Sequence, residues 1–417
     1  MKKNGFTLVE ITVCVVLLVT IFLIVVPKVN TMINNKKKNA YNSLISTVKD
    51  AAQAYVYLNV NIVDDAIESQ GYYEVSIRTL QENELLENKL ENPLTGKNIP
   101  STSIVKIIKN NEEYIYKFSL DYQYLLEHII DLYSSEETRI SNGLKKDNTP
   151  DQNIRYYGSN PNNYVRFNNE LWRIIGVFGN NVKLVRKDSL GSLSWDSSES
   201  SVNNGFGVNE WSQSALKNYL NTMYYGGTSV TCYGGTKNST TTCPTGTIDE
   251  TAKSLIDNHI WNTGAIEYNT RTDTLAFYNA ERGTKGKICT SSNYCNDTVT
   301  RTTSWTGYVG LPYVTDWAYA SSESICETNM QKQDSSNAYI CKNNNWMQRS
   351  DDTWYLSPLA HSGDADVVWN VLGVGYASNF SASTSIGVAP AIYLKSNVLI
   401  ESGNGTSSSP YILKAGS

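Results

Sequence analysis

The chain has 417 residues, a net charge of −5 and a charged fraction of 18%, which lies below the roughly 25% of an average globular protein. A hydrophobic fraction of 40% is sufficient for a folded protein, and the length predicts two or three domains. The acidic balance argues against direct nucleic-acid binding, because surfaces that bind nucleic acid are basic. With 28 tyrosines and 9 tryptophans but only 3 histidines, the composition favours a binding protein over an enzyme.

An apolar segment covers residues 6–26, interrupted by the carboxylate of Glu10 and three threonines. As a helix it would extend about 32 Å at ~1.5 Å per residue, which matches the ~30 Å hydrocarbon core of a membrane. Pro27 and Lys28 follow it, in place of the small residues of a signal-peptide cleavage site. We therefore expect the segment to remain in the mature protein. A carboxylate inside such a segment is costly, which indicates a functional role for Glu10.

Residues 2–10, KKNGFTLVE, resemble the class III leader of type IV prepilins and pseudopilins. The resemblance implies that residues 1–5 are a leader, which a prepilin peptidase removes after Gly5 before it methylates Phe6. It also implies that Glu10 pairs with the N-terminal amine of a neighbouring subunit, and that Pro27 breaks the helix as in many pilins. We expect the N-terminus to lie inside the cell, although the lysines at 28 and 36–38 would by themselves favour the opposite orientation.

The N-terminal helix is expected to continue past Pro27 and to cover residues 6–58. From Tyr41 onward, apolar residues recur at the spacing of an amphipathic helix. Residues 59–120 then predict a small α+β domain, with a strand and helix over 72–86 and a hairpin formed by 105–108 and 114–118. A long helix on a small antiparallel sheet is the layout that the pilin resemblance implies, through about residue 120.

Residues 121–150 predict one more helix and a polar linker, and a separate domain is expected over residues 151–417. This domain holds all nine tryptophans and six of the seven cysteines. An even number of cysteines in an exported domain indicates disulfide bonds. Six cysteines allow about 15 connectivities, but their grouping favours three local bridges, Cys232–Cys243, Cys289–Cys295 and Cys326–Cys341. The spacings of zinc sites are missing, and no metal is expected.

Several elements of this domain can be predicted from the pattern of apolar and turn residues. A three-stranded meander is expected from residues 164–167, 171–178 and 182–185. Helices are expected over 209–221 and 248–261. Strands are expected at 353–356, 367–372 and 388–394, followed by a hairpin over 398–413 around Gly403 and Gly405.

The motifs TWYLSP, VVWNVLGVG and GVAPAIYLKS, in that order, resemble uncharacterised surface domains of Firmicutes and Mollicutes. The ends of those domains are similar to the C-type lectin-like and formylglycine-generating-enzyme-like superfamily, which implies a C-type lectin-like fold for about residues 150–417. Trp369 and Asn370 stand where lectins have a Trp-Asn-Asp calcium motif. Val371 replaces the acid, so no calcium site is expected, and Asp364 and Asp366 are interpreted as part of a solvated loop.

No catalytic constellation emerges from the sequence. Of the three histidines, only His361 has a serine and acids close by, and residues so close in sequence rarely converge into a triad. The stretch 283–287 lacks the first glycine and the Ser/Thr of a P-loop. We therefore expect no catalytic residue and no cofactor.

The aromatic residues divide into two groups. Trp172, Trp354 and Trp369 lie in predicted strands, which favours a place in the core. Five others lie in predicted loops, where an exposed ring can anchor a ligand. These candidate binding residues are Trp305, Tyr308, Trp317, Trp346 and Tyr376.

Taken together, these observations predict an α+β protein with a long N-terminal transmembrane helix and a small antiparallel sheet, followed by a large mixed, mainly β, disulfide-bridged domain. The predicted function is that of a minor pilin-like subunit near a filament tip, whose C-terminal domain lies outside the cell and binds a glycan or protein. The expected partners are a prepilin peptidase, other pilin subunits, the assembly platform and the cytoplasmic membrane. The alternative is a pseudopilin of a type II secretion or DNA-uptake apparatus with an assembly role.

Overall fold

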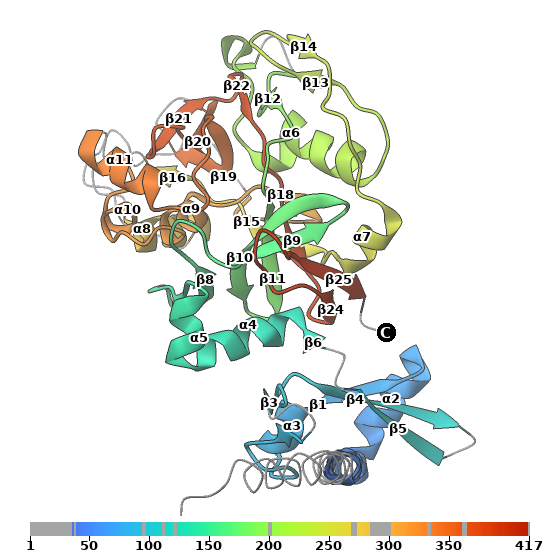
Figure 1. Cartoon of the computed structure of the whole chain (residues 1–417). Helices are drawn as coiled ribbons and strands as arrows, with labels where there is room; N and C mark the ends of the chain where they lie inside the picture. The colour runs from blue at the N-terminus through green and yellow to red at the C-terminus, as the bar shows by residue number, and fades with distance from the viewer. Residues whose placement is uncertain are drawn as a thin grey trace, which may run out of the picture. The chain divides into compact units, whose positions relative to one another are not determined.

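The computed structural model describes residues 36, 39–93, 97–110, 113–119, 123–198, 202–267, 273–283, 302–331, 335–360 and 365–415. The chain divides into two compact units, Met1–Gln123 and Tyr124–Ser417 (Figure 1). The predicted leader and apolar segment, with Gly5, Phe6, Glu10 and Pro27, lie outside the described residues.

In the first unit, a helix of residues 39–58 packs against a three-stranded antiparallel sheet. The helix buries Val48 and Ala52 of the predicted apolar stripe, together with Val56, against Val75 and Ile107 of the sheet. The chain bends at Asn59 into a second helix, which ends at the left-handed Gly71. The elements of this unit are α2 (Val60–Gln70), β1 (Tyr73–Ser76), α3 (Ile77–Glu82), β2 (Glu91–Asn92), β3 (Lys97–Asn98), β4 (Ile104–Asn110) and β5 (Glu113–Ser119).

The predicted hairpin of the first unit is confirmed. β4 and β5 pair antiparallel from Ile104↔Ser119 to Asn110↔Glu113, and β1 adds to the other edge of β4. The predicted strand and helix over 72–86 correspond to β1 and α3. The side chain of Ser76 accepts a hydrogen bond of 3.0 Å from the backbone N–H of Thr79 and so caps the start of α3.

The second unit is built on a ten-stranded sheet with the order β18-β23-β11-β10-β9-β25-β24-β6, to which β7 and β8 add beside β10 (Figure 1). The predicted meander is confirmed as β9, β10 and β11, and the turn between its first two strands has Asn168 and Asn169 at φ +53° and +58°. The strands are β6 (Gln123–Tyr124), β7 (Leu144–Lys146), β8 (Ile154–Tyr156), β9 (Tyr164–Phe167), β10 (Glu170–Phe178), β11 (Asn181–Arg186), β18 (Val309–Gly310), β23 (Ala391–Leu394), β24 (Val398–Ser402) and β25 (Tyr411–Ala415).

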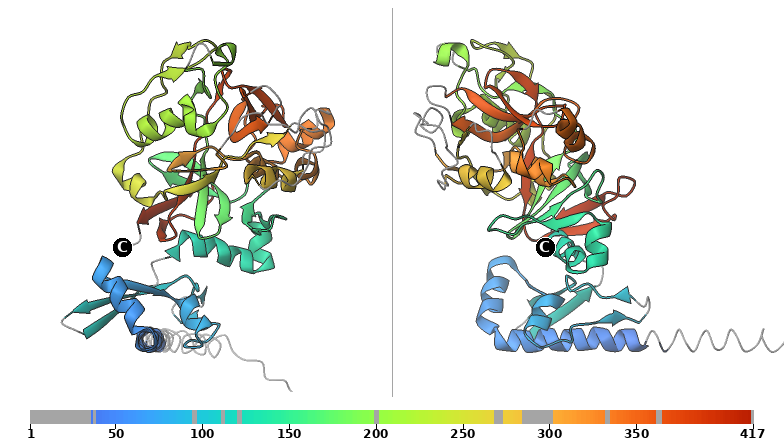
Figure 2. Two further views of the ribbon diagram at one scale, coloured as in Figure 1. Left: turned by 180° about the vertical axis from the view of Figure 1, so that it is seen from behind. Right: turned by 90° about the vertical axis from the view of Figure 1, so that its left-hand side faces the viewer.

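A second sheet of this unit has the order β12-β22-β19-β20-β21, with β16 parallel to β19. Figure 2 shows it from two further sides, beside the helices that follow residue 273. Its strands are β12 (Ser192–Ser194), β16 (Ile266–Glu267), β19 (Thr353–Ala360), β20 (Val367–Val371), β21 (Ala377–Ser381) and β22 (Ser385–Gly387). Two short ribbons are formed by β13 (Cys232–Tyr233) with β14 (Thr240–Thr241) and by β15 (His259–Asn262) with β17 (Ser304–Gly307).

The helices of the second unit are mostly short. They are α4 (Leu125–Ser134), α5 (Glu136–Ser141), η1 (Val202–Gly205), η2 (Trp211–Gln213), α6 (Ala215–Asn218), η3 (Tyr219–Tyr225), α7 (Glu250–Leu255), α8 (Thr274–Glu281), α9 (Val314–Tyr319), α10 (Ile325–Thr328) and α11 (Ser335–Asn343). The predicted helix over 209–221 is thus divided among η2, α6 and η3, and Ser214 caps the α-helical part. Ser214 can do this because its backbone is extended while its side chain faces the N–H of Lys217.

Tryptophan rings form much of the core of the second unit. Trp172, Trp354 and Trp369 are fully buried, which confirms their predicted core positions. The ring of Trp195 lies 5.1 Å from that of Trp211 and 6.1 Å from that of Trp354, measured between centroids. Large aromatic side chains therefore fill space between short elements.

The expected fold class is wrong in describing the part of the chain after the N-terminal unit as mainly β. Helix and strand each account for 31% of the described residues, so the described chain is not mainly β. In the described part of the chain, no helix has the length and apolarity needed to cross a membrane. The helical share comes from segments such as α9, whose residues are all buried; a helix buried on every side shows no amphipathic pattern in its sequence.

Two predicted segments also differ from the structure. The helix expected over 248–261 ends at Leu255, because the N–H of Asp257 donates to Tyr393 O and His259–Asn262 then pairs with β17. The region expected to be linker, which ends at residue 150, contains α5 and β7, and the second unit starts at Tyr124 rather than near residue 150. β7 pairs with β8, and β8 pairs with β10, so pairing between residues distant in sequence joins this region to the large sheet.

Candidate functional site

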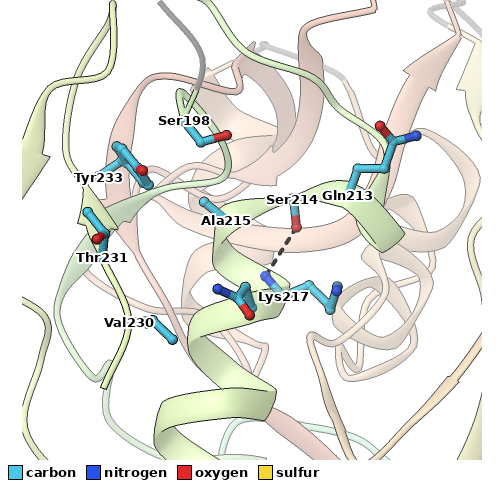
Figure 3. Close-up of a pocket in the computed structure, with 9 residues that line it drawn as sticks. Ser198, Gln213, Ser214, Ala215, Lys217, Val230, Thr231 and Tyr233 are labelled. Carbon is cyan, nitrogen blue, oxygen red and sulfur yellow. Dashed lines mark hydrogen bonds between the residues drawn. The ribbon is translucent and has the colours of Figure 1, made fainter. Parts of the chain in front are cut away.

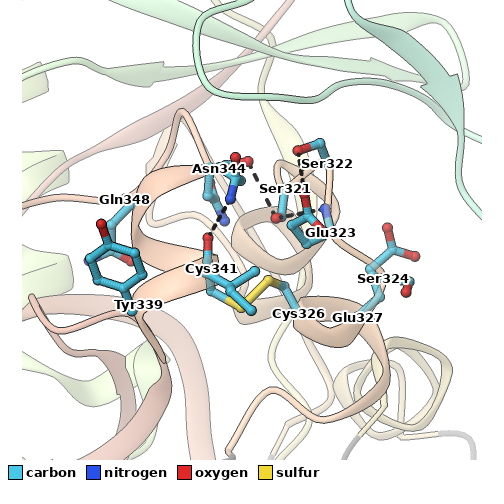
Figure 4. The surroundings of a disulfide bond; sticks show 12 residues. Ser321, Ser322, Glu323, Ser324, Cys326, Glu327, Tyr339, Cys341, Asn344 and Gln348 are labelled. Carbon is cyan, nitrogen blue, oxygen red and sulfur yellow. Dashed lines mark hydrogen bonds between the residues drawn. A yellow bond between two sulfur atoms is a disulfide. The ribbon is translucent and has the colours of Figure 1, made fainter. Parts of the chain in front are cut away.

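Two of the three predicted disulfides are present in the described residues. Cys232–Cys243 and Cys326–Cys341 have Cα–Cα distances of 5.2 and 5.8 Å. The second bridge joins α10 to α11 (Figure 4). The predicted pair Cys289–Cys295 lies outside the described residues. Disulfide bonding of this unit is therefore confirmed in part.

Removing the Cys326–Cys341 bridge with a Cys326→Ser, Cys341→Ser double substitution should lower the free energy of unfolding by about 3 kcal/mol, because the bridge closes a loop of 15 residues. Urea titration followed by tryptophan fluorescence measures the change. A Ser322→Ala variant on the neighbouring loop is the control. Equal stability of the bridged and double-serine proteins would contradict the prediction.

The five predicted binding aromatics do not form one exposed cluster. Trp317, in α9, and Trp346 are 1% and 8% exposed. Trp305, in β17, packs against Trp211 with 5.8 Å between ring centroids. Tyr308 stacks on a neighbouring tyrosine at 4.2 Å, and Tyr376 is half-buried. Among these five, only Trp346 lines one of the two pockets described below.

One pocket, of about 420 Å³, lies where the start of α6 faces the chain that leads into β13 (Figure 3). We call it the Lys217 pocket. The Cys232–Cys243 bridge anchors one wall of this pocket, since Thr231 and Tyr233 flank the first cysteine. Burial lowers the pKa of Lys217 from its ordinary value. Its lining is mostly polar and consists of Ser198, Gln213, Ser214, Ala215, Lys217, Asn218, Val230, Thr231 and Tyr233.

A second pocket, of about 430 Å³, lies between the β10–β11 part of the large sheet and the segment 346–353. We call it the arginine pocket. Both volumes fall in the range of roughly 300–1,000 Å³ that is typical of small-molecule sites. The arginine pocket is lined by Arg173, Val185, Lys187, Asp188, Ser189, Trp346, Met347, Gln348, Arg349, Ser350, Asp351 and Thr353.

The guanidinium group of Arg173, in the arginine pocket, lies close to two aromatic rings. It is 3.8 Å from the ring centroid of Tyr164 and 4.8 Å from that of Trp346. Arg173 Nε donates to Asn163 Oδ1 at 2.5 Å. Burial lowers the pKa of Arg173 to about 10, so the group still carries its charge at neutral pH.

Ionisable groups are also buried away from both pockets. Asp316 accepts hydrogen bonds from Arg155 Nη1 at 2.5 Å and from Lys183 Nζ at 2.6 Å, and all three side chains are at most 4% exposed. Arg155 also pairs with Asp147 at 2.8 Å. Each acid in this network is matched by a cation, which is typical of a structural ion-pair cluster.

The histidines of the described region have structural partners. His128 Nε2 lies 2.9 Å from Tyr411 Oη, and burial lowers its pKa to about 4. His259 stacks on Tyr393 and hydrogen-bonds Asp257. His361 and Asp364 lie outside the described residues. Among the residues that are described, no group of three or more His, Cys, Asp or Glu side chains could hold a metal ion.

The polar groups that line the two pockets are suited to binding a polar small molecule. Sequence analysis missed Arg173, Lys217 and Arg349. For Arg173 a signal was present, because it is the one charged residue within LWRIIGVF, whose other members are apolar or glycine. A cation inside a buried strand indicates either an ion pair or a binding site. No family model, no curated protein and no solved structure matches this chain.

Proposed function

We propose that this protein is a pilin-like subunit, which a prepilin peptidase cleaves between Gly5 and Phe6 and which carries a binding module on a surface filament. The observation that carries the proposal is the sequence KKNGFTLVE followed by an apolar run to Val26. In such a filament, Glu10 would pair with the N-terminal amine of the neighbouring subunit, which would offset the cost of placing a carboxylate in an apolar segment.

The disulfides of the second unit support export of this part of the chain. Cys232–Cys243 and Cys326–Cys341 are bonded, and such bonds persist in oxidising, extracytoplasmic compartments. The proposal therefore has the apolar segment at the cytoplasmic membrane during assembly and the second unit outside the cell. A prepilin peptidase, other pilin subunits and the membrane assembly platform are the proposed partners.

The pockets of the second unit support a binding role. Both are large enough for a ligand of monosaccharide size, and their walls combine charged, amide and hydroxyl groups. The proposed ligand is a glycan or a protein at a host or environmental surface.

Replacing Gly5 by alanine tests the processing step. In cells that contain a prepilin peptidase, the unchanged protein should begin at a methylated Phe6, whereas Gly5→Ala should accumulate with residues 1–5 attached. Intact mass and N-terminal sequencing distinguish these products. The matched control is Glu10→Val, which leaves the cleavage site intact and should still be processed but should fail to enter filaments. An unprocessed chain in the unchanged protein would refute the proposal.

A further inference from the structure

We propose that the arginine pocket binds the carboxylate of a ligand of about monosaccharide size, such as an acidic sugar. The inference rests on the proposed function only in treating the second unit as a binding module. The evidence for it is the positive charge buried in the walls of the pocket.

The first observation is that Arg173 is buried beside neutral groups. Arg173 is 6% exposed, and its side chain donates to Asn163 Oδ1 at 2.5 Å and to the Pro161 carbonyl at 3.3 Å. The rings of Tyr164 and Trp346 cover its guanidinium group. Within the described part of the chain, no Asp or Glu forms an ion pair with Arg173.

The second observation is a second guanidinium group in the same pocket. Arg349 Nη2 donates to the carbonyl of Arg186 at 2.6 Å, and Nη1 donates to the carbonyl of Lys187. These bonds tie the segment 346–353 to the end of β11. Because both acceptors are backbone carbonyls, they fix the position of the guanidinium group without neutralising its charge.

The acids of the pocket lie at its exposed rim. The side chain of Asp188 is 70% exposed and pairs with Lys187 at 3.0 Å. Asp351 is exposed and accepts a hydrogen bond of 3.3 Å from Ser350 Oγ. The buried part of the pocket is therefore positive, while the carboxylates are exposed to solvent, from where Asp188 still attracts Arg349.

The charge balance favours a ligand with one negative charge. The pocket lining contains Arg173, Lys187 and Arg349 against two aspartates, a surplus of one positive charge. A carboxylate carries one negative charge and matches the planar fork of a guanidinium group, whereas a phosphomonoester carries nearly two. A buried cation without a counterion is costly, and an entering carboxylate would reduce that cost.

Calorimetric titration of the full-length protein in detergent with D-glucuronate, D-glucose and inorganic phosphate tests the inference. D-glucuronate should bind at least about tenfold more tightly than D-glucose, which has the same ring without the carboxylate. Arg349→Gln and Arg173→Gln should each weaken D-glucuronate binding by about tenfold or more. Lys395→Gln, an exposed residue that lines neither pocket, is the control and should change the affinity less than about twofold.

Arg349 is half-buried, so the Arg349→Gln variant should fold. It therefore tests the inference even if the Arg173→Gln variant does not fold. Three outcomes would overturn the inference: no binding of D-glucuronate, equal affinity for D-glucose, or an unchanged affinity in Arg349→Gln. Tighter binding of phosphate than of D-glucuronate would overturn the assignment to a carboxylate. Processing at Gly5 is measured by mass, so a failure of the pilin proposal can be distinguished from a failure of this pocket.

Discussion

Replacing Asp316 by asparagine should lower the free energy of unfolding by about 3–5 kcal/mol. Asp316 accepts from Arg155 and Lys183, and it also accepts the backbone N–H of Tyr313 at 2.9 Å. Lys183 is 0% exposed, so loss of the carboxylate leaves its ammonium group buried without its counterion. The Coulomb attraction of both cations lowers the pKa of Asp316, although burial alone would raise it.

Urea titration at neutral pH, followed by tryptophan fluorescence, measures this loss. Asp351→Asn provides the matched control, since Asp351 is exposed and the same change there should stay within about 0.5 kcal/mol. A loss of less than about 1 kcal/mol for Asp316→Asn would show that the network is solvated or rearranges, contrary to this prediction.

A second large effect is expected from Glu281. This carboxyl group is 1% exposed, and its closest hydrogen bond is 3.3 Å long, donated by the hydroxyl of Thr315. Burial raises its pKa from 4.5 to about 8, although the charge of Arg282 opposes the change. The folded chain therefore holds a proton on Glu281 that the unfolded chain releases.

The direction in which the free energy of unfolding changes with pH follows from this raised pKa. The contribution of Glu281 to stability is fully present below about pH 4.5 and is lost as the pH rises to about 8, by an amount on the order of 5 kcal/mol. The Glu281→Gln variant has no ionisable group at this position, so its free energy of unfolding should not fall for this reason as the pH rises. Other groups titrate in the same range, among them His128 with the opposite sign. The difference between the unchanged protein and Glu281→Gln isolates the effect.

Unfolding free energies at pH 5 and pH 8 provide the measurement. The unchanged protein should become less stable relative to Glu281→Gln as the pH rises between these values. Glu250→Gln, at an exposed helix start, serves as the control and should follow the unchanged protein. If the stabilities of the unchanged protein and Glu281→Gln run parallel from pH 5 to pH 8, Glu281 is already ionised in the folded state and the prediction is wrong.

The arginine pocket shows why sequence reasoning found only part of the candidate site. Trp346 was predicted to bind a ligand because it is an aromatic residue in a predicted loop. It does line the pocket, but its ring is buried beside Arg173 rather than exposed. Arg173 and Arg349 stand far apart in the chain. They share one pocket because Arg349 donates to the carbonyls at the end of β11, a contact that no local pattern contains.

The sequence by itself determined the elements whose causes are local. Alternation and asparagine turns determined the meander from β9 to β11, and apolar runs on either side of Asn110 and Asn111 predicted the hairpin of β4 and β5. Close spacing selected two cysteine pairs that are bonded. Only the tertiary structure decided where the predicted helix over 248–261 stops, that α9 forms, and that Asp316 meets Arg155 and Lys183. The physical reason is that these features depend on burial and pairing between segments distant in sequence, whose free energy outweighs the weak preferences of the local chain.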